Sequence, residues 1–404
     1  MKKKIMVLGA GEFQVPIIKK VKEMGHEVIV VSPKGDYPGF KFSDQIIYED
    51  VSNEKGVLSH AKNLNIDGIT TNQTDIPVRT MAYVSTKLGL SGIDYETACL
   101  FTDKLMMRDK CAELGLDTVK YKLVNSAKDI ENFFVELGSA VIVKPVDSQG
   151  SRGIQVVESL NDIEKAFSYA ASFSRSNSVI VEEFLVGDEF VIEGVVYDGN
   201  YNDLVVGDSF YFETVKTFSP YCRQFPSEKN TDLISKFNKQ LIESFGLSFG
   251  LTHSEVIVAK GKCHLIETAA RGGGVNISSK LVKACSGFDA DAFMIDIALG
   301  NTPNMEVYNT GVVSSYIAFY LPEGTVKTVD GIILAKSHCS YIDSSLDSIS
   351  VGNKSLGFSD KTSRVYILLS ANNHSELREC IDFYKNVIKV DVLTNNGMRG
   401  LIWN

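Results

Sequence analysis

The chain has 404 residues, of which 44% are hydrophobic and 23% charged, and its formal net charge is −9. These values predict a soluble globular protein of two or three domains and argue against a nucleic-acid-binding surface. The opening MKKK precedes an apolar run of strand length only, with no signal-peptide cleavage pattern and no membrane span, so we expect a cytoplasmic protein. The seven cysteines show no CxxC spacing, which favours reduced thiols over disulfides or zinc.

Residues 1 to about 94 alternate strand and helix patterns. We expect strands at Lys4–Leu8, Glu27–Val31, Ile46–Tyr48 and Gly68–Thr71, and helices at Gln14–Met24, Asn53–Asn63 and Ile76–Lys87. Repeated βα units predict a parallel sheet that is covered on both faces.

Two loops of this region could bind a ligand. Gly9-Ala10-Gly11 follows the first strand and suggests a dinucleotide site, but Gln14 replaces the third glycine of the motif and Ser32-Pro33 stands where an acidic ribose ligand is expected. The loop Asn72–Asp75 follows a strand at the sheet edge where such folds bind ligands, and it is equally compatible with a capped turn.

The next region predicts a helix at Leu105–Leu114 with Thr102 as its N-cap, then strands at Lys120–Val124 and Ala140–Val143 around a helix at Ala127–Leu137. Lys144 ends the second strand and leads into a loop rich in serine and glycine. Backbone N–H groups of such a loop and a lysine charge suit phosphate binding, although the spacing differs from a Walker A loop. A tight loop without a ligand is the alternative.

A helix at Leu160–Ser174 and a strand at Val179–Glu183 follow. The polar turn after this strand could present backbone groups to an adenine edge, with Glu189 placed for ribose hydroxyls, but acidic residues at strand ends are common. A hairpin at Phe190–Tyr197 and Tyr201–Phe212, an irregular loop from Phe212 to Glu228 and a helix at Thr231–Phe245 complete this part.

The stretch from Gly250 to Gly274 predicts a β-hairpin with strands at Ser254–Ala259 and Cys263–Ala269. If Lys260-Gly261-Lys262 forms a three-residue turn, Glu255 lies opposite Glu267. Opposed carboxylates repel each other, so a cation such as Mg²⁺ is the natural occupant between them.

Side-chain alternation puts His253, Ala269 and Arg271 on the same face as the two glutamates. The alternatives are a solvated strand face and a two-residue turn, which would send the carboxylates to opposite faces. Beyond the hairpin, Gly272–Asn276 predicts a flexible turn. We expect helices at Ile277–Ser286, Asp289–Leu299 and Ser375–Val387, and strands at Val312–Leu321, Ile332–Leu334 and Val365–Ser370.

The order of these motifs resembles that of the ATP-grasp superfamily of carboxylate–amine ligases. The motifs are Asp103-Lys104, Lys144-Pro145 with its loop, Glu182-Glu183-Phe184-Leu185 with Gly187–Phe190, and Glu255 with Glu267–Arg271. Phrases such as VKPVDSQGSRGI and LIETAARGGG look most like the branch that holds the L-amino-acid ligases, with biotin carboxylase and D-alanine:D-alanine ligase as more distant relatives.

The resemblance implies a mixed α/β and α+β fold. It has a Rossmann-like pre-ATP-grasp domain at residues 1–94, a two-lobed ATP-grasp domain at 95–305 and a β-rich C-terminal domain at 306–404.

The resemblance also implies roles for individual residues. Lys104 and Lys144 would hold ATP phosphates under a flexible loop of Ser148, Gly150, Ser151 and Gly153. The backbone of Glu183 and Leu185 would meet adenine, with Glu182 nearby and Glu189 on the ribose. Glu255 and Glu267 would bind Mg²⁺ (Mn²⁺ is an alternative), and Arg271 would steady an acyl phosphate. Ala269 stands where many relatives have an asparagine metal ligand, so the binding of a second metal is in doubt.

The implied reaction transfers the γ-phosphate of ATP to a carboxylate, after which an amine displaces phosphate to give an amide. The partners would be small-molecule acids and amines, with no nucleic acid or membrane, and a homodimer is left open. The alternatives are an ATP-binding protein without activity and, from Gly9-Ala10-Gly11 alone, a nicotinamide-dependent oxidoreductase. The sequence does not name the substrates; Arg223, Tyr221 and the Asn72–Asp75 loop are candidate pocket residues.

Overall fold

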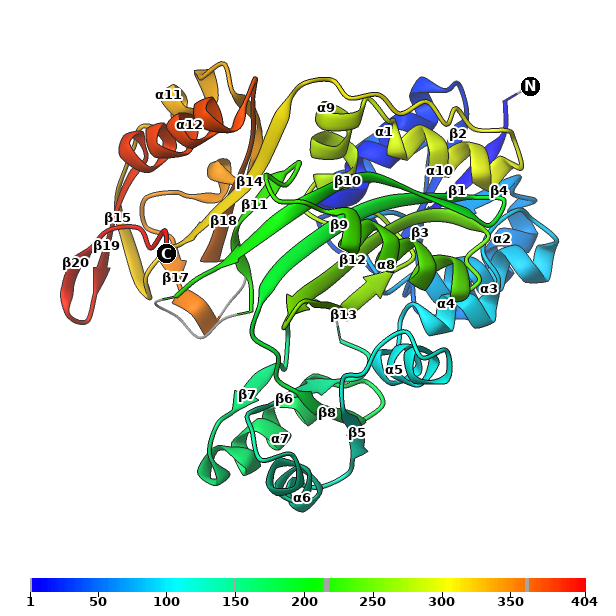
Figure 1. Ribbon diagram of the computed structural model, residues 1–404. Helices are drawn as coiled ribbons and strands as arrows, with labels where there is room; N and C mark the ends of the chain where they lie inside the picture. The colour runs from blue at the N-terminus through cyan, green and yellow to red at the C-terminus, as the bar shows by residue number, and fades with distance from the viewer. Residues whose placement is uncertain (1, 149, 214–217, 360–362) are drawn as a thin grey trace. The chain divides into compact units, whose positions relative to one another are not determined.

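The computed structural model describes residues 2–148, 150–213, 218–359 and 363–404 (Figure 1). The chain divides into two compact units. The first comprises Met1–Leu204, Thr231–Ser279 and Phe288–Val307, and the second comprises Val205–Asn230, Lys280–Gly287 and Tyr308–Asn404. The predicted domain boundaries after residues 94 and 305 remain a prediction. Within the described ranges, no helix has the length and apolar character needed to cross a membrane.

The first unit begins with a four-stranded parallel sheet, as predicted. Its strands are β1 (Lys4–Leu8), β2 (Glu27–Ser32), β3 (Gln45–Tyr48) and β4 (Gly68–Thr70), in the order β3-β2-β1-β4. The connecting helices are α1 (Val15–Glu23), α2 (Glu54–Leu64) and α3 (Val78–Leu88). Strands β1 and β2 are almost wholly buried, which explains why they read as continuous apolar runs rather than alternating ones.

Two short helices lead from this sheet into the next part of the unit, α4 (Tyr95–Leu100) and α5 (Lys104–Glu113). The predicted N-cap Thr102 is wrong by one residue. The carboxylate of Asp103 accepts the N–H groups of Leu105 and Met106, whereas the Thr102 hydroxyl donates to Ala98 O. Because the helix begins at Lys104, this lysine extends from the first turn of α5.

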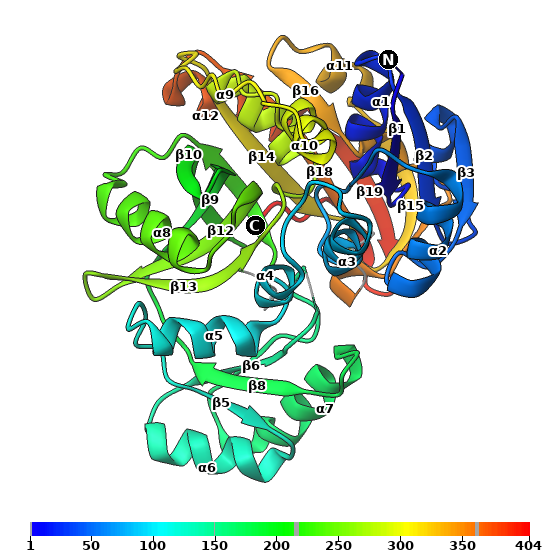
Figure 2. The same cartoon turned by 90° about the vertical axis from the view of Figure 1, so that its right-hand side faces the viewer.

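A small antiparallel sheet follows, with the order β5-β8-β6-β7. Its strands are β5 (Tyr121–Val124), β6 (Val141–Pro145), β7 (Gln155–Val157) and β8 (Val179–Glu183). Helices α6 (Ala127–Leu137) and α7 (Ile163–Phe173) pack together against one face of it (Figure 2). The apolar residues of the helices and strands form one buried cluster, which fixes β6 and β8 side by side and therefore positions Lys144 and Glu182.

The central strands of the first unit are β9 (Asp188–Tyr197), β12 (Phe249–Ala259) and β13 (Lys262–Ala269), paired antiparallel as β9-β12-β13. Strand β10 (Asn200–Tyr211) starts in the first unit and ends in the second. Helix α8 (Asp232–Ser244) precedes β12, and α9 (Val282–Ser286) and α10 (Ala290–Leu299) follow β13. Residues Ile277–Leu281 form a π-helical turn in place of the first part of the predicted Ile277–Ser286 helix.

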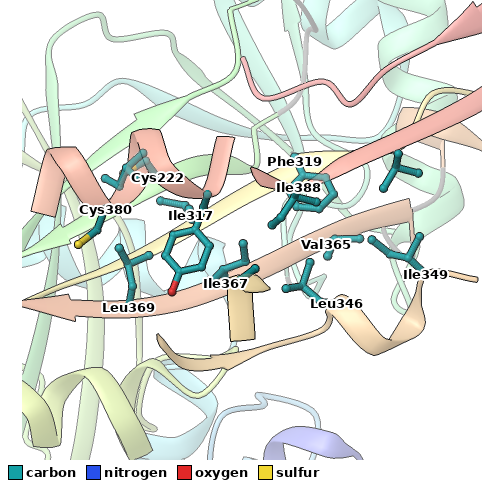
Figure 3. Packing of buried hydrophobic residues seen from close by; sticks show 14 of the residues in the cluster. Cys222, Ile317, Phe319, Leu346, Ile349, Val365, Ile367, Leu369, Cys380 and Ile388 are labelled. Carbon is teal, nitrogen blue, oxygen red and sulfur yellow. The ribbon is translucent and has the colours of Figure 1, made fainter. Parts of the chain in front are cut away.

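The second unit is rich in strands. Its elements are β11 (Pro220–Phe225), β14 (Val313–Tyr320), β15 (Gly324–Asp330), α11 (Ile332–Ser337), β16 (Tyr341–Ser344), β17 (Lys354–Ser355), β18 (Arg364–Ala371), α12 (His374–Val387), β19 (Lys389–Thr394) and β20 (Gly397–Arg399). Strands β11, β14, β18 and β16 pair in that order, and β17, β15, β19 and β20 form a second sheet. Figure 3 shows the buried apolar side chains that pack between these elements.

Two predictions for the second unit are wrong. The segment from Phe212 to Glu228, expected to be an irregular loop, contains strand β11, on which Cys222 and Phe225 are buried; residues 214–217 of this prediction lie outside the described residues. Ile332–Leu334, expected to be a strand, begins helix α11. The prediction treated this apolar run as a buried strand, but Ile333 is 88% exposed. A short apolar run alone does not distinguish a strand from a helix.

Candidate active site

The two glutamates of the central hairpin face each other, as predicted, but by a different route. The turn has two residues, Lys260 and Gly261, both with positive φ (50° and 75°), so Ala259 pairs with Lys262. This geometry matches a two-residue type I′ turn and corrects the predicted three-residue turn. A β-bulge between Glu255 and Val256 then shifts the register by one residue, and Glu255 pairs directly with Glu267.

Lys104 supplies positive charge to this pair. Its Nζ lies 2.8 Å from Glu267 Oε1 and 2.7 Å from the carbonyl oxygen of Ser148. Burial would lower the pKa of Lys104, but Glu267 and then Asp75 and Glu182 outweigh burial and raise it. Lys104, predicted to bind phosphate, therefore contacts both Ser148 of the predicted phosphate loop and Glu267, a predicted metal ligand.

The hairpin carboxylates suit a hard cation that takes further ligands from a substrate. Within the described ranges, no group of three or more histidine, cysteine, aspartate or glutamate side chains is arranged to hold a metal ion. Mg²⁺ is commonly held by one or two carboxylates together with phosphate oxygens and water. Glu255 and Glu267 therefore fit a Mg²⁺ ion that arrives with a nucleotide better than a metal held by the protein alone.

His253 lies on the same strand and forms a buried pair that the sequence did not reveal. Its Nδ1 is 2.5 Å from Glu193 Oε1, and its Nε2 is 3.5 Å from Glu255 Oε1. Burial would lower the pKa of His253, but Glu193 outweighs this effect and raises it. The backbone N–H of Gly273 donates to Glu193 Oε2 at 2.8 Å, and a Cβ atom at 273 would lie 2.1 Å from Glu193 Oε1, so this position requires glycine.

Arg271 is held by a loop of the parallel sheet. Its Nε and Nη2 donate to the two carboxylate oxygens of Asp75 at 2.7 and 2.9 Å, and its Nη1 donates to the carbonyl of Gly272. This bidentate arrangement fixes the plane of the guanidinium group. Asp75 belongs to the Asn72–Asp75 loop, which was predicted as a possible ligand-binding loop. Within the protein, this loop binds the predicted catalytic arginine.

The same loop fastens the segment after β13. Asn72 donates to Asp291 Oδ1 and accepts the N–H of Gly272, while Gln73 donates to Ser279 Oγ and accepts the N–H of Asn276. Val275 takes a positive φ of 56°, which is strained for a β-branched residue and needs surrounding contacts to persist. The turn predicted at Gly272–Asn276 is present, and these hydrogen bonds hold it.

Lys144 and Glu182 form part of a separate buried charge cluster. Lys144 Nζ lies 2.8 Å from Glu182 Oε2, and Arg108 binds the same carboxylate through Nε at 3.0 Å and Nη2 at 2.9 Å. Burial would raise the pKa of Glu182, but Arg108 and Lys144 outweigh it and hold the pKa at about 2. Glu182, predicted to lie near adenine, is thus an internal anion for two cations.

Arg108 was missed by the sequence reasoning, although its spacing gave a signal. It follows Lys104 by four residues on α5, so both side chains lie on one helix face, and both are buried. Asp117 receives the remaining contact of Arg108 at 3.1 Å and also binds His264 Nδ1 and the N–H of Leu265. This network ties α5 to strand β13, the strand that carries Glu267.

The predicted phosphate loop runs from Ser148 to Gly153, and Gln149 within it lies outside the described residues. Gly150 is exposed and Gly153 is buried. Asp147, immediately before the loop, accepts the Ser174 hydroxyl and the N–H groups of Arg175 and Ser176. The N-terminal end of the loop is therefore anchored to the chain that follows α7.

The backbone predicted to contact adenine is partly used in hydrogen bonds of the small antiparallel sheet. The N–H of Glu183 donates to Lys120 O at 2.8 Å, so an adenine contact from this residue would use its carbonyl. Leu185 follows β8 and is half-buried, and Glu189 is a half-buried residue near the start of β9. Glu189 pairs with Ile257 on β12, two residues beyond Glu255.

A cavity of about 160 Å³ opens beside the Lys104–Glu267 pair. Asp75 and Ser148 line it, and two arginines that the sequence reasoning did not single out, Arg152 and Arg175, add positive charge. A cavity with lysine, arginine and carboxylate side chains suits a phosphate group accompanied by a cation.

The space beside the glycine loop Gly9-Ala10-Gly11 is filled by a side chain of the protein. The side chain of Gln14 packs over it, with its Nε2 donating to Asn72 O at 3.0 Å, and Cβ atoms at Gly9 and Gly11 would lie 3.1 Å from Gln14 atoms. These glycines therefore make room for Gln14, which argues against a dinucleotide at this loop.

Comparison with known proteins agrees with this geometry. Residues 137–279 match the family model for the ATP-grasp domain. Alanine–anticapsin ligase of Bacillus subtilis strain 168 is 27% identical over 267 residues, covering 60% of this chain and 56% of the relative. A formate-dependent phosphoribosylglycinamide formyltransferase of Chlorobium phaeobacteroides is 32% identical over 197 residues, covering 46% and 48%. The chain spans about half the length of these curated relatives.

Among solved structures, an L-amino acid ligase from Bacillus licheniformis superposes with a TM-score of 0.82 at 20% identity, covering 96% of this chain and 98% of that chain. A biotin carboxylase from Campylobacter jejuni gives a TM-score of 0.72 at 17% identity, covering 100% and 93%. The chain therefore contains an ATP-grasp domain and has the ATP-grasp fold. The resemblance inferred from the order of the sequence motifs is confirmed.

Proposed function

We propose that the protein is an ATP-dependent carboxylate–amine ligase that forms an amide or peptide bond through an acyl phosphate and releases ADP and phosphate. The observation that carries the proposal is the direct pairing of Glu255 with Glu267 beside Lys104 and a cavity lined by cationic groups. Opposed carboxylates destabilise a sheet unless a cation accompanies them. Two opposed carboxylates at this position make sense if ATP and Mg²⁺ complete the site.

Lys104 is proposed to exchange partners when ATP binds. Its Nζ now bonds to Glu267, and an incoming phosphate offers a stronger, doubly charged acceptor in the same cavity. Release of Glu267 would free its carboxylate, together with that of Glu255, for Mg²⁺ or Mn²⁺. The ion would supply charge neutralisation on the phosphates. Lys144, Ser148, Gly150, Ser151 and Gly153 are proposed to hold the remaining phosphate oxygens.

The nucleoside end of the site is proposed from the strand that ends at Glu183. The carbonyl of Glu183 and the backbone of Leu185 would contact adenine, and Glu189 would bind the ribose. Glu182 is proposed to act through Lys144 and Arg108, which it orients, rather than on adenine itself.

Arg271 is proposed to bind the acyl phosphate. Asp75 holds its guanidinium in a fixed plane, so the group does not need to reorganise as charge develops on the substrate. No side-chain nucleophile is required, because the phosphoryl group moves directly from ATP to the carboxylate and the amine then attacks the acyl carbon. We propose small-molecule acid and amine substrates and a cytoplasmic location, and leave a homodimer open.

The names of the relatives support the ligase class over the alternatives. One matched relative is called an alanine–anticapsin ligase, and a superposed structure is called an L-amino acid ligase. An ATP-binding protein without activity is disfavoured by the presence of Arg271 together with Glu255 and Glu267, because phosphate binding alone does not need a group placed for an acyl phosphate.

The experiment is a product analysis. The full chain is incubated with ATP, Mg²⁺ and a panel of amino acids and small carboxylic acids, with hydroxylamine as the amine. We expect ADP and phosphate in equal amounts, and a hydroxamate that appears only with an accepted acid. AMP and pyrophosphate as products, or ATP cleavage that no carboxylate stimulates, would contradict the proposal. A thermal-shift comparison of ATP with NADH tests the oxidoreductase alternative.

A further inference from the structure

A second cavity, of about 410 Å³, lies within the second unit. It opens beside α12 over strands β10, β11 and β14. Its walls combine three aromatic side chains, Phe210, Tyr221 and Trp403, with four charged ones, Glu228, Arg378, Asp382 and Lys385. None of these residues has a role in the site proposed for ATP.

The cavity exists because α12 covers only part of the sheet face. The helix packs against β14 and β18, and its buried side chains Leu377, Ile381 and Tyr384 belong to the core. Cys222 and Ile317, both labelled among the core side chains in Figure 3, also line the cavity, so its floor is continuous with the core. Trp403 packs on Phe319 with ring centroids 4.4 Å apart, which holds one aromatic wall in place.

The charged wall comes from one face of α12. Arg378, Asp382 and Lys385 are spaced by four and three residues, so their side chains lie along one stripe of the helix. Arg378 Nη1 is already paired with Glu228 Oε2 at 2.8 Å. In the part of the chain that the structure describes, neither Asp382 nor Lys385 forms an ion pair.

Lys385 is close to the floor of the cavity. Burial raises the pKa of the Cys222 thiol to about 11, and Lys385 is one of the groups that act in the opposite direction. Arg378 and Glu228 neutralise each other, so within the described residues the cavity presents the unpaired charges of Asp382 and Lys385, three residues apart on the helix, above an apolar and aromatic surface.

We propose that this cavity binds a free α-amino acid with an aromatic or aliphatic side chain. The carboxylate would lie at Lys385, the ammonium group at Asp382 and the side chain against Phe210, Tyr221 and Trp403. A volume of about 410 Å³ is near the lower end of the range of small-molecule pockets, which suits an amino acid better than a nucleotide. The proposal concerns a site outside the ATP-grasp residues and stands whether or not the ligase reaction is found.

The chain offers a direct probe, because Trp403 is its single tryptophan. The full-length protein, without ATP or Mg²⁺, is titrated with L-phenylalanine and L-leucine while tryptophan fluorescence is recorded with excitation at 295 nm. We expect a saturable change. Phenethylamine and 3-phenylpropionate each lack one of the two charges, and we expect each to bind at least about tenfold more weakly. A flat fluorescence titration together with no heat of binding in calorimetry would overturn the proposal, as would equal binding of the singly charged analogues.

Two variants locate the site. Lys385→Gln and Asp382→Asn should each weaken L-phenylalanine binding about tenfold, whereas Lys389→Gln, at an exposed lysine of β19 in the same unit, should leave it unchanged. Glu267→Gln should also leave it unchanged; loss of binding there would assign the amino acid to the candidate active site and overturn the proposal. A fluorescence change that follows protein concentration rather than amino acid, with dimers in sedimentation, would show that a second copy of the chain covers the cavity instead.

Discussion

The first unit contains two lysine–glutamate pairs of the same length in different surroundings. Lys144–Glu182 and Lys104–Glu267 both measure 2.8 Å, and both lysines are buried. The side chain of Glu182 is 2% exposed and is bound by a second cation, Arg108, whereas the side chain of Glu267 is 31% exposed, faces Glu255 and borders a cavity.

This difference separates a closed charge cluster from an open one. The carboxylate of Glu182 has both oxygens bound by protein cations, so it has little to gain from a ligand. The hairpin pair places two facing carboxylates, one beside Lys104 and one beside His253, at the edge of a cavity that a metal ion and a phosphate group could enter. The same pair of residue types thus forms a closed cluster, in which Glu182 orients Lys144, in one place and an open pair beside a cavity in the other.

The largest effect should come from the open cluster. Glu267→Gln keeps the shape of the side chain but removes the charge proposed to hold Mg²⁺, so Mg²⁺-dependent ADP formation should fall by about 10³-fold. The free energy of unfolding without ligands should change by less than about 1 kcal/mol, because the lost Lys104 contact is offset by relief of the opposed pair. Glu131→Gln, at a surface ion pair on α6, is the matched control and should be fully active. A Glu267→Gln protein with near-normal turnover would rule out the metal site.

A substitution in the closed cluster should mainly lower the free energy of unfolding. Glu182→Gln removes the partner of two buried cations and should lower the free energy of unfolding by about 3 kcal/mol. The effect depends on pH, because the folded protein holds the pKa of Glu182 at about 2, below the ordinary glutamate pKa of 4.5. The wild-type contribution is present above pH 4.5 and is lost as the pH falls toward 2, so the gap between wild type and variant should narrow over that window. Urea unfolding at pH 7, 4.5 and 3 measures the difference in unfolding free energy between wild type and variant. A difference that does not depend on pH would contradict a charged, ion-paired Glu182.

Replacing each lysine by methionine compares the clusters directly. Lys144→Met leaves the buried Glu182 with Arg108 alone and should cost about 2 kcal/mol in the free energy of unfolding. Lys104→Met leaves Glu267 with access to water and should cost less than about 1 kcal/mol. Both variants should lose the thermal shift produced by ATP. Equal costs in urea unfolding would show that the two clusters do not differ as described.

The parts of the fold that depend on local pattern could be predicted from the sequence. Strands β1 and β2 are short apolar runs, and α6 and β8 were predicted with the bounds that the structure shows, because periodicity and end residues mark them. The order of the motifs was enough to indicate the ATP-grasp fold, since each motif occupies a fixed place along the chain.

The register of the hairpin shows where local reasoning stops. A three-residue turn was predicted and a two-residue turn is present, but the bulge beside Glu255 compensates for that difference. Nothing in the residue types around Ile266 marks a bulge, and β12 keeps a regular register with β9 on its other side. The facing glutamates were thus predicted correctly from an incorrect turn.

The charge partners could not be predicted, because they are distant in sequence. Glu182 lies 38 residues from Lys144 and 74 from Arg108, and Asp75 lies 196 from Arg271. Only the packing of β6 against β8, and of the Asn72–Asp75 loop against the segment after β13, brings these groups together. Which of two lysines is buried in a closed cluster is therefore a property of the tertiary structure.

The smallest predicted effect concerns Asp75. Its hydrogen bonds to Arg271 connect the segment after β13 with a loop of the parallel sheet. Asp75→Asn keeps one hydrogen-bond acceptor for Arg271 but removes the charge and the bidentate geometry. Arg271 should then sample other orientations, so kcat for ADP formation should fall about tenfold, while the Kd for ATP should change by less than about twofold. Asp67→Asn, at an exposed pair with Lys3 in the same sheet, is the control. Asp75 lines the cavity but is proposed to act by positioning Arg271, so an Asp75→Asn variant with weakened ATP binding and unchanged kcat would show that this loop belongs to the nucleotide site instead.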